Sequence, residues 1–260
     1  MAKDATRSLM QLDKLVSFLD RELAIAKFKD DSHNGLQVAN SGRVTKVCVG
    51  VDATLPFFEK AAACGADLAI CHHGLSWSDS LKRITGLNYR LLSFLLKHDL
   101  ALWACHLPLD AHPQLGNNAC LARALGLRAC RPAFDYHGQM IGVCGALPQP
   151  VLFTVFQKLV ARVVGNEVRV LDFGRRTVRT VGIVSGGGAS QIDQAAELGL
   201  DVYVTGESNL YAYNLARQED LNAVFAGHYA TEKCGVQAVG RLLRRRFGLP
   251  VEFVDMGIVY

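Results

Sequence analysis

The sequence predicts an α/β protein made of two pseudo-repeated α/β lobes, each with a largely parallel sheet. Short runs rich in valine, isoleucine and leucine alternate with helical segments along most of the 260 residues. This alternation is typical of βαβ units, in which a helix connects two parallel strands. Two stretches, starting at Val49 and Val181, share the order strand, turn, helix, Gly-x-Asp and second strand. The shared order indicates an internal duplication.

The predicted elements follow from the spacing of apolar residues. Leucines at helical spacing predict an amphipathic helix over residues 8–27, and a polar loop (29–42) follows it. Strands are expected near residues 44–51, 67–71, 100–105, 178–184, 201–205, 221–226 and 251–254. Helices are expected between them, near residues 56–65, 88–98, 117–125, 189–199, 208–218 and 231–247.

The middle of the chain, residues 127–175, interrupts this alternation. Strands are expected near 139–146 and 167–173, on either side of a helix near 151–164. We therefore expect an N-terminal lobe (1–126), a connecting segment (127–177) and a C-terminal lobe (178–260), with the two lobes packed as one compact unit.

The composition is ordinary for a soluble globular protein, with half of the residues apolar and a fifth charged. The net charge of +4 does not indicate nucleic-acid binding. The densest basic cluster, Arg244–Arg246, is either a solvated helix end that complements the helix dipole or a small nucleic-acid patch. The charge therefore leaves nucleic acid as an unsupported partner.

No membrane or secretory segment is expected. The first fifteen residues lack the apolar core of a signal peptide, and no apolar run approaches the roughly 20 residues that span a bilayer. The eight cysteines contain no C-x-x-C pair, and several lie within apolar runs. They are typical of buried thiols in a reducing compartment, so we expect a cytoplasmic protein.

Two adjacent histidines, His72 and His73, end a predicted strand. Neighbouring residues on a strand point to opposite faces, so one imidazole could pack in the core and the other lie at the surface. At a strand end, however, the chain can bend and both rings can face one cleft, which is where open α/β sheets place their sites. The choice between packing and ligand binding stays open at this point.

The repeat brings further polar residues to predicted strand ends. His106 and His228 each follow a strand and precede a carboxylate by four residues, at Asp110 and Glu232. Glu207 aligns with His73 when the repeats are superposed at Gly-x-Asp, which makes it a further candidate ligand. Pro108 is expected to keep His106 and Asp110 off a helix, whereas Glu232 falls in the first turn of the helix predicted at 231–247.

These side chains form a nitrogen and oxygen donor set without thiolates. Such a set suits zinc, iron, manganese or nickel. Four imidazoles and two carboxylates exceed the three protein ligands that one catalytic ion usually takes, and a pair of ions uses them better. His106 either binds metal or orients a ligand, His228 either binds metal or caps a helix, and Asp110 could cap its loop instead.

Several blocks of the chain resemble the Nif-three-like dinuclear-metal proteins, commonly described as GTP cyclohydrolase 1 type 2 homologues. The resemblance covers nearly the whole chain and rests on five blocks in order: HNGLQV (33–38), HHG (72–74), HLPLDAHPQLGNNA (106–119), TGE (205–207) and GHYATE (227–232). It implies two divalent metal ions per chain, in the cleft between the lobes. By motif, it implies the metal ligands His72, His73, Asp110, His228 and Glu232, with no separate organic cofactor. It also implies a homohexamer, a toroidal trimer of dimers.

The sequence favours a metal-dependent hydrolase that activates a water for attack on a nucleotide or phosphoester-type substrate, as the cyclohydrolase description of the family implies. No catalytic residue is assigned, although His106 could act as an acid or base. Two alternatives stay open, a non-catalytic toroidal scaffold for nucleic acid or protein, and metal storage or delivery. The glycine-rich run Ser185–Ser190 is either a tight turn or an anion-binding nest, and Trp77 either packs or lines the cleft.

Overall fold

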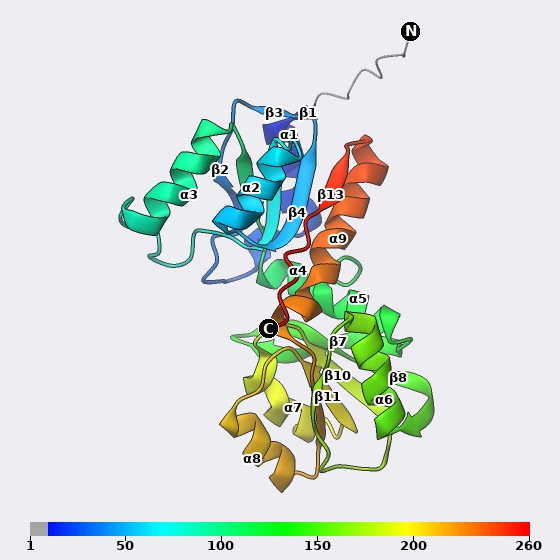
Figure 1. Cartoon of the computed structure of the whole chain (residues 1–260). Helices are drawn as coiled ribbons and strands as arrows, with labels where there is room; N and C mark the ends of the chain where they lie inside the picture. Colours follow the sequence, from blue (N-terminus) through cyan, green and yellow to red (C-terminus); the bar gives the residue numbers. More distant parts are fainter. Residues whose placement is uncertain (1–9) are drawn as a thin grey trace. The chain divides into compact units, whose positions relative to one another are not determined.

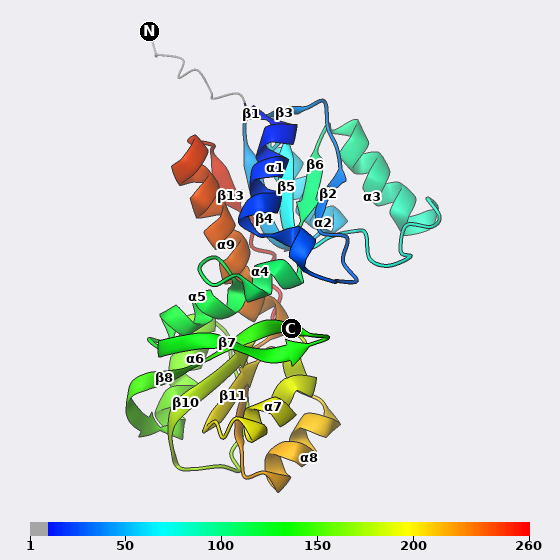
Figure 2. The same ribbon diagram turned by 180° about the vertical axis from the view of Figure 1, so that it is seen from behind.

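The computed structural model describes residues 10–260, which form two compact units. The first contains the described residues up to Pro108 together with Val236–Met256, and the second contains Leu109–Gly235 with Gly257–Tyr260. The chain passes from one unit to the other within helix α4 (Leu107–Ala111), within helix α9 (His228–Phe247) and between Met256 and Gly257. Figure 1 labels the elements of both units, and Figure 2 shows them from behind.

The first unit is built on a five-stranded sheet with the order β13-β4-β5-β6-β2. The strands span Val251–Phe253 (β13), Val47–Asp52 (β4), Leu68–His73 (β5), Ala101–Ala104 (β6) and Gly35–Val38 (β2). The first four run parallel, and β2 is antiparallel to β6. A short antiparallel pair, β1 (Met10–Gln11) with β3 (Arg43–Val44), lies outside this sheet.

Helices cover both faces of this sheet. On one face, α2 (Leu55–Ala63) and α3 (Gly86–Lys97) bury their apolar residues against Ala69 and Leu102. On the other face lie α1 (Leu12–Glu22) and the second half of α9 (Figure 2). A short 3-10 turn, Ile25–Lys27, follows α1. Trp103 alternates with Leu102 and points to the α1 side, where its indole N–H donates to Asp20 at 2.9 Å.

The second unit has a six-stranded mixed sheet with the order β7-β8-β10-β11-β12-β9. The strands span Arg128–Tyr136 (β7), Gln139–Leu152 (β8), Thr177–Val184 (β10), Val202–Thr205 (β11), Asn222–Phe225 (β12) and Arg169–Leu171 (β9). The three central strands β10, β11 and β12 are parallel, and the other three pair antiparallel.

The second sheet is also covered on both faces. The helices α5 (Asn117–Ala124) and α6 (Phe153–Val164) pack on Val202 and Val204. Tyr203 points to the opposite face, where its hydroxyl donates to the Gly188 carbonyl at 2.6 Å. That face carries a 3-10 turn (Gly188–Gln191) and the helices α7 (Ile192–Glu197) and α8 (Leu210–Gln218), as Figure 1 shows.

The two units share an aspartate turn at the amino ends of their parallel strands. Asp67 accepts hydrogen bonds from the main chain of Thr45 and Lys46 and from the Thr45 hydroxyl, at 2.6–3.0 Å. Asp201 accepts the matching set from Arg179 and Thr180 at 2.9 Å. The strand registers are also equivalent, because Val47 pairs with Leu68 and Val181 pairs with Val202. This turn is the physical basis of the repeat seen in the sequence.

The α/β class and the order of the main elements are confirmed. The first helix is shorter than expected and begins at Leu12; the predicted part at residues 8–9 lies outside the described residues. The polar loop contains β2, and the segment 127–177 supplies β7, β8, α6 and β9 to the sheet of the second unit. The unit boundaries thus differ from the expected lobe boundaries, because that segment pairs with the C-terminal strands and α9 contributes to both units.

The prediction that Pro108 excludes a helix around Asp110 is wrong. Helix α4 begins at Leu107 and contains both residues. Proline is tolerated in the first turn of a helix because its missing N–H would have no intrahelical partner there. Helix α9 likewise begins earlier than expected, at His228, so that Glu232 lies one turn inside it. Among the described residues, no helix is long and apolar enough to cross a membrane.

The aspartate turn predicts a pH-dependent loss of stability. Burial would raise the pKa of Asp201, but hydrogen bonds from Thr180 and Arg179 and the charge of Arg175 lower it. A lowered folded-state pKa stabilises the fold above the unfolded value near 3.9, and this stabilisation is lost as the pH falls through the folded value. Asp201→Asn should therefore cost about 1.5–3 kcal/mol at pH 7, with a smaller cost below about pH 4.

Denaturant unfolding of both proteins at pH 7 and pH 3 measures this difference. The equivalent substitution Asp67→Asn should also destabilise the fold at pH 7, because a neutral amide oxygen accepts the three hydrogen bonds of Asp67 more weakly than a carboxylate does. A cost for Asp201→Asn that is equal at both pH values would contradict the role given to the ionised carboxylate.

Candidate metal centre

Three histidines of the first unit converge at the carboxyl edge of its sheet. His72 and His73 end β5, and His106 follows β6. Their ring centroids lie 4.6 Å (His72–His73), 5.2 Å (His72–His106) and 5.7 Å (His73–His106) apart. One potential ligand atom from each ring lies within 4.8 Å of the others. The three rings can therefore bind a common metal ion, with His106 as the third donor.

Each of these rings is oriented by an oxygen at its Nδ1 atom. The distances are 2.9 Å from His72 to the Cys105 carbonyl, 2.8 Å from His73 to Asp52 Oδ1 and 3.0 Å from His106 to Asp30 Oδ1. A carbonyl or carboxylate oxygen accepts a hydrogen bond, so Nδ1 carries the proton in each ring. In the neutral rings, Nε2 then keeps the lone pair that binds a metal.

Asp30 organises the approach to His106 from a distant part of the sequence. Its carboxylate accepts hydrogen bonds from Ser32 N, from the Asn34 amide and from Leu107 N, the first residue of α4, each at 3.0 Å. Burial would raise the pKa of Asp30, but the hydrogen bond and charge of His106, with the hydrogen bonds from Asn34 and Ser32, lower it to about 2. Asp30 is therefore ionised at neutral pH and holds both the ring and the start of the helix.

The second unit gathers acidic ligands around one histidine. His228 Nδ1 lies 2.5 Å from Glu207 Oε1, and its Nε2 lies 3.2 Å from Glu232 Oε1, one turn along α9. Burial would lower the pKa of His228, but hydrogen bonds and charges of Glu232 and Glu207 outweigh it and raise the pKa to about 9. These surroundings favour a positive charge at the ring, whether a proton or a metal ion carries it.

Asp110 is buried in α4 of the same unit, at 7% exposed, and Glu232 is buried at 2%. Asp110 Oδ1 accepts hydrogen bonds from the Asn117 amide at 2.8 Å and from the Ser185 hydroxyl at 2.9 Å. Asp110 is thus oriented by the residue just before Gly186, which itself lies against His228 and Glu232. The structure gives Asp110 this buried position and does not leave it as a loop cap.

A family model described as Duf34/NIF3 (NGG1p interacting factor 3) matches residues 10–257. The chain belongs to the NIF3 family. It is 39% identical over 243 residues to the GTP cyclohydrolase 1 type 2 homolog of Deinococcus radiodurans, covering 94% of this chain and 92% of that protein. These findings confirm the family resemblance on which the ligand prediction rests.

Solved structures of NIF3-like chains have the same fold. The protein ybgI is 34% identical and has a TM-score of 0.91, covering 96% of this chain and all of that one. The protein TTHA1606 from Thermus thermophilus is 38% identical, with a TM-score of 0.89 and the same coverage. Both relatives share the fold of this NIF3 member and at least 34% of its sequence.

The sequence indicated the candidate ligands of this NIF3 chain, but it did not indicate Asp52 and Asp30, which orient His73 and His106. Asp52 pairs with His73 across the parallel strands β4 and β5, so its place at the end of a predicted strand was a usable signal. Asp30 lies 76 residues before His106 in the polar loop, and no local pattern indicates that contact. Glu207, which the repeat suggested as a ligand, lies against the opposite nitrogen of His228 from Glu232 and orients the ring.

The register of the strands also corrects one part of the repeat alignment. Cys105 N donates to the Cys71 carbonyl, and Ala226 N donates to the Thr205 carbonyl, so residues 105 and 226 are equivalent. His106 therefore corresponds to Gly227 and not to His228. The similar spacing of His106–Asp110 and His228–Glu232 does not reflect matching positions in the two sheets.

Gly186 allows the close approach of the acidic ligands. Its φ is +63°, and a Cβ atom there would lie 2.1 Å from Glu232 Oε1 and 2.9 Å from His228 Nε2. Its N–H donates to the Thr231 hydroxyl at 3.0 Å, which fixes the turn to α9. The start of the Ser185–Ser190 run therefore forms a tight turn whose glycine leaves space in front of the two donors.

Gly186→Ala should displace both side chains and lower metal retention at least severalfold. Gly199→Ala is a matched control, because Gly199 has nearly the same φ, +62°, but nothing within 4 Å of its added Cβ. Both variants carry the backbone strain of about 1–2 kcal/mol, and only Gly186→Ala adds the clash. Denaturant unfolding and metal analysis of the two variants separate these effects. Equal metal content would contradict this role of Gly186.

Proposed function

We propose that this chain binds two divalent metal ions through His72, His73, Asp110, His228 and Glu232, with His106 as a further imidazole donor, and that it is a metal-dependent hydrolase. The single observation that carries the proposal is the convergence of three imidazoles whose Nδ1 atoms are all held by oxygens. Structural histidines have no need of a common orientation, whereas metal-binding histidines usually donate their second N–H to a carboxylate or carbonyl.

The chemistry of the donors supports a metal of the zinc, iron, manganese or nickel type. All candidate ligand atoms are imidazole nitrogens or carboxylate oxygens, which these ions accept. The nearby thiols are poor alternatives, since burial raises the pKa of the Cys71 thiol well above its usual range. Three imidazoles in the first unit and three acidic or imidazole donors in the second exceed the needs of one ion, which supports two ions per chain.

In this proposal the protein supplies orientation and shelter. Divalent ions bound here would lower the pKa of a water and stabilise the negative charge of its attack on a carbon or phosphorus centre. Asp30 holds the His106 ring so that its Nε2 can bind an ion or move a proton. The Trp77 ring lies 4.9 Å from His106 and 5.9 Å from His73, and its N–H donates to the Gly74 carbonyl. The indole thus packs beside both rings.

A nucleotide or phosphoester is the proposed class of substrate. Relatives such as that of Deinococcus radiodurans carry the name GTP cyclohydrolase 1 type 2 homolog, which makes guanosine triphosphate the first compound to test. A metal-activated water suits either hydrolysis of a phosphoester or attack on a purine ring carbon.

Metal content tests the ligand assignment directly. Elemental analysis of protein purified without oxygen should approach two ions per chain. Glu232→Gln keeps the shape of a buried side chain but replaces an anionic donor with a neutral amide, so it should lose at least one ion. Glu219→Gln, at an exposed position at the end of α8, should keep both. Two ions retained at unchanged affinity in Glu232→Gln would remove this residue from the ligand set.

Turnover tests the reaction. With the native metal restored, guanosine triphosphate or an activated phosphodiester should be hydrolysed, and His73→Ala should lower the rate at least a hundredfold. His98→Ala, at the end of α3, is the control that should leave the rate unchanged. Tightly bound metal without turnover of any substrate in the screen would reject the hydrolase and favour a non-catalytic scaffold. Weak and exchangeable metal without turnover would favour storage or delivery.

We also propose that the chain assembles as a homohexamer, a trimer of dimers, as expected from the family resemblance. Exposed apolar side chains on α8, such as Leu210 at 75% exposed, support a subunit contact, because large exposed apolar groups often mark interfaces. Light scattering should give a mass of six times 28.3 kDa. A monomer mass at micromolar concentration would reject the assembly.

A further inference from the structure

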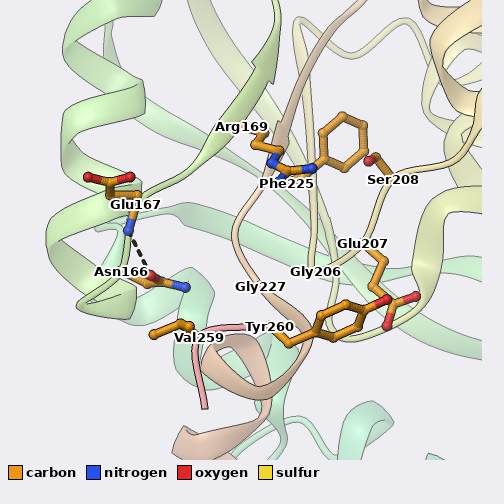
Figure 3. A pocket seen from close by; sticks show the side chains of 10 residues that line it. All are labelled: Asn166, Glu167, Arg169, Gly206, Glu207, Ser208, Phe225, Gly227, Val259 and Tyr260. Atoms are coloured by element: carbon orange, nitrogen blue, oxygen red, sulfur yellow. Dashed lines mark hydrogen bonds between the residues drawn. The ribbon is translucent and has the colours of Figure 1, made fainter. Parts of the chain in front are cut away.

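A pocket of about 230 Å³ opens beside Glu207 in the second unit (Figure 3). Its floor is formed where β11 and β12 end, at Gly206 and Gly227, which is the edge at which open α/β sheets bind ligands. Glu207 forms one wall, and the same carboxylate orients the candidate ligand His228. A molecule in this pocket would therefore contact the group that holds a predicted metal ligand.

The charged residues that line the pocket are one arginine, Arg169, and two glutamates, Glu167 and Glu207. Arg169 lies at the start of β9, and in the part of the chain that the structure describes its guanidinium takes part in no ion pair. The negative charge of Glu207 faces His228. Glu167 also borders the pocket, but Figure 3 shows its carboxylate directed away from Glu207 and Phe225. The arrangement favours an anionic group, which a guanidinium can bind through two parallel hydrogen bonds.

Aromatic rings and neutral donors surround this charge. Phe225 is the direct strand partner of Arg169, and Figure 3 shows the guanidinium next to its ring. The Tyr260 ring and the Ser208 hydroxyl complete the rim. Gly227, at a φ of +87°, leaves the floor open, because a Cβ there would lie 3.0 Å from the Asn166 amide nitrogen. The pocket thus offers a flat ring a place to lie beside the anion-binding group.

We propose that this pocket binds the phosphate of a nucleotide and part of its ring system, with Arg169 as the phosphate ligand. Ligand sites usually measure about 300–1,000 Å³, and this pocket is smaller, so it takes one end of a substrate. This inference rests on the proposed function, because the pocket would bind one end of the nucleotide substrate that is proposed for the candidate metal centre.

Equilibrium binding to the full chain tests the pocket without any turnover. Guanosine monophosphate, guanosine and inorganic phosphate are titrated by calorimetry into metal-loaded protein. Guanosine monophosphate should bind at least tenfold more tightly than either fragment. Arg169→Ala should weaken guanosine monophosphate binding about tenfold or more, because it removes a charge-assisted contact, and should leave guanosine unchanged. Arg169→Lys should lie between the two, since lysine keeps the charge but lacks the paired donors.

Two controls make this result specific. Arg162→Ala removes an exposed arginine on α6 that does not line the pocket, and it should bind guanosine monophosphate like the unaltered chain. The titrations are repeated after chelator treatment, because phosphate can also bind directly to a metal ion. The Arg169 effect should persist in the metal-free protein.

Three outcomes would overturn the inference: no binding of guanosine monophosphate up to millimolar concentration, equal binding of guanosine and its monophosphate, or equal affinity in Arg169→Ala. A loss of metal in Arg169→Ala would also overturn it, because the arginine would then act on the metal site itself. Binding that depends on Arg169, together with no hydrolysis of any compound, would reject the proposed hydrolase and keep the nucleotide pocket.

Discussion

The properties of this site depend on hydrogen bonds that fix the Nδ1 atoms of four histidines. An imidazole that rotates, or that carries its proton on the wrong nitrogen, cannot present Nε2 to a cation. Two of the four acceptors are themselves held: the Cys105 N–H donates to the Cys71 carbonyl, and Asp30 accepts several further hydrogen bonds. The orientation of each ring thus derives from strand pairing and loop structure. Without this orientation by the fold, the rings could not bind a metal ion.

The two units use the same scaffold for different donors. Where the first unit has His72 and His73 at the end of β5, the second has Gly206 and Glu207 at the end of β11. The first unit therefore presents imidazoles oriented by oxygens, and the second presents carboxylates grouped around His228. The same βαβ arrangement thus carries a softer nitrogen donor set in one unit and a harder oxygen donor set in the other, because the residues at the strand ends differ.

The amino-acid sequence was sufficient to predict most helices and strands and to indicate the candidate ligands, because the apolar runs end where the strands end and polar residues follow them. It was insufficient where long-range contacts override local character. The strand β2 lies in a polar loop and was not expected, since Leu36 pairs with the distant Trp103. The edge strand β7 carries Arg128, Arg131 and exposed positions, which disguise it. Asp30 shows the same limit for the site, because its role exists only once the chain has folded.

The aspartate turns have a consequence for how such a protein can change over evolutionary time. They fasten neighbouring strands at the amino edge of each sheet, through Asp67 and Asp201 bound to main-chain groups of the preceding strand. The candidate ligands and the pocket lie at the opposite edge. The residues that stabilise the strand pairing are therefore separate from the residues of the candidate site. Metal-binding or pocket residues at one edge can change during evolution while the aspartates at the other edge keep the strands in register. A new activity would then require few substitutions and no change of fold.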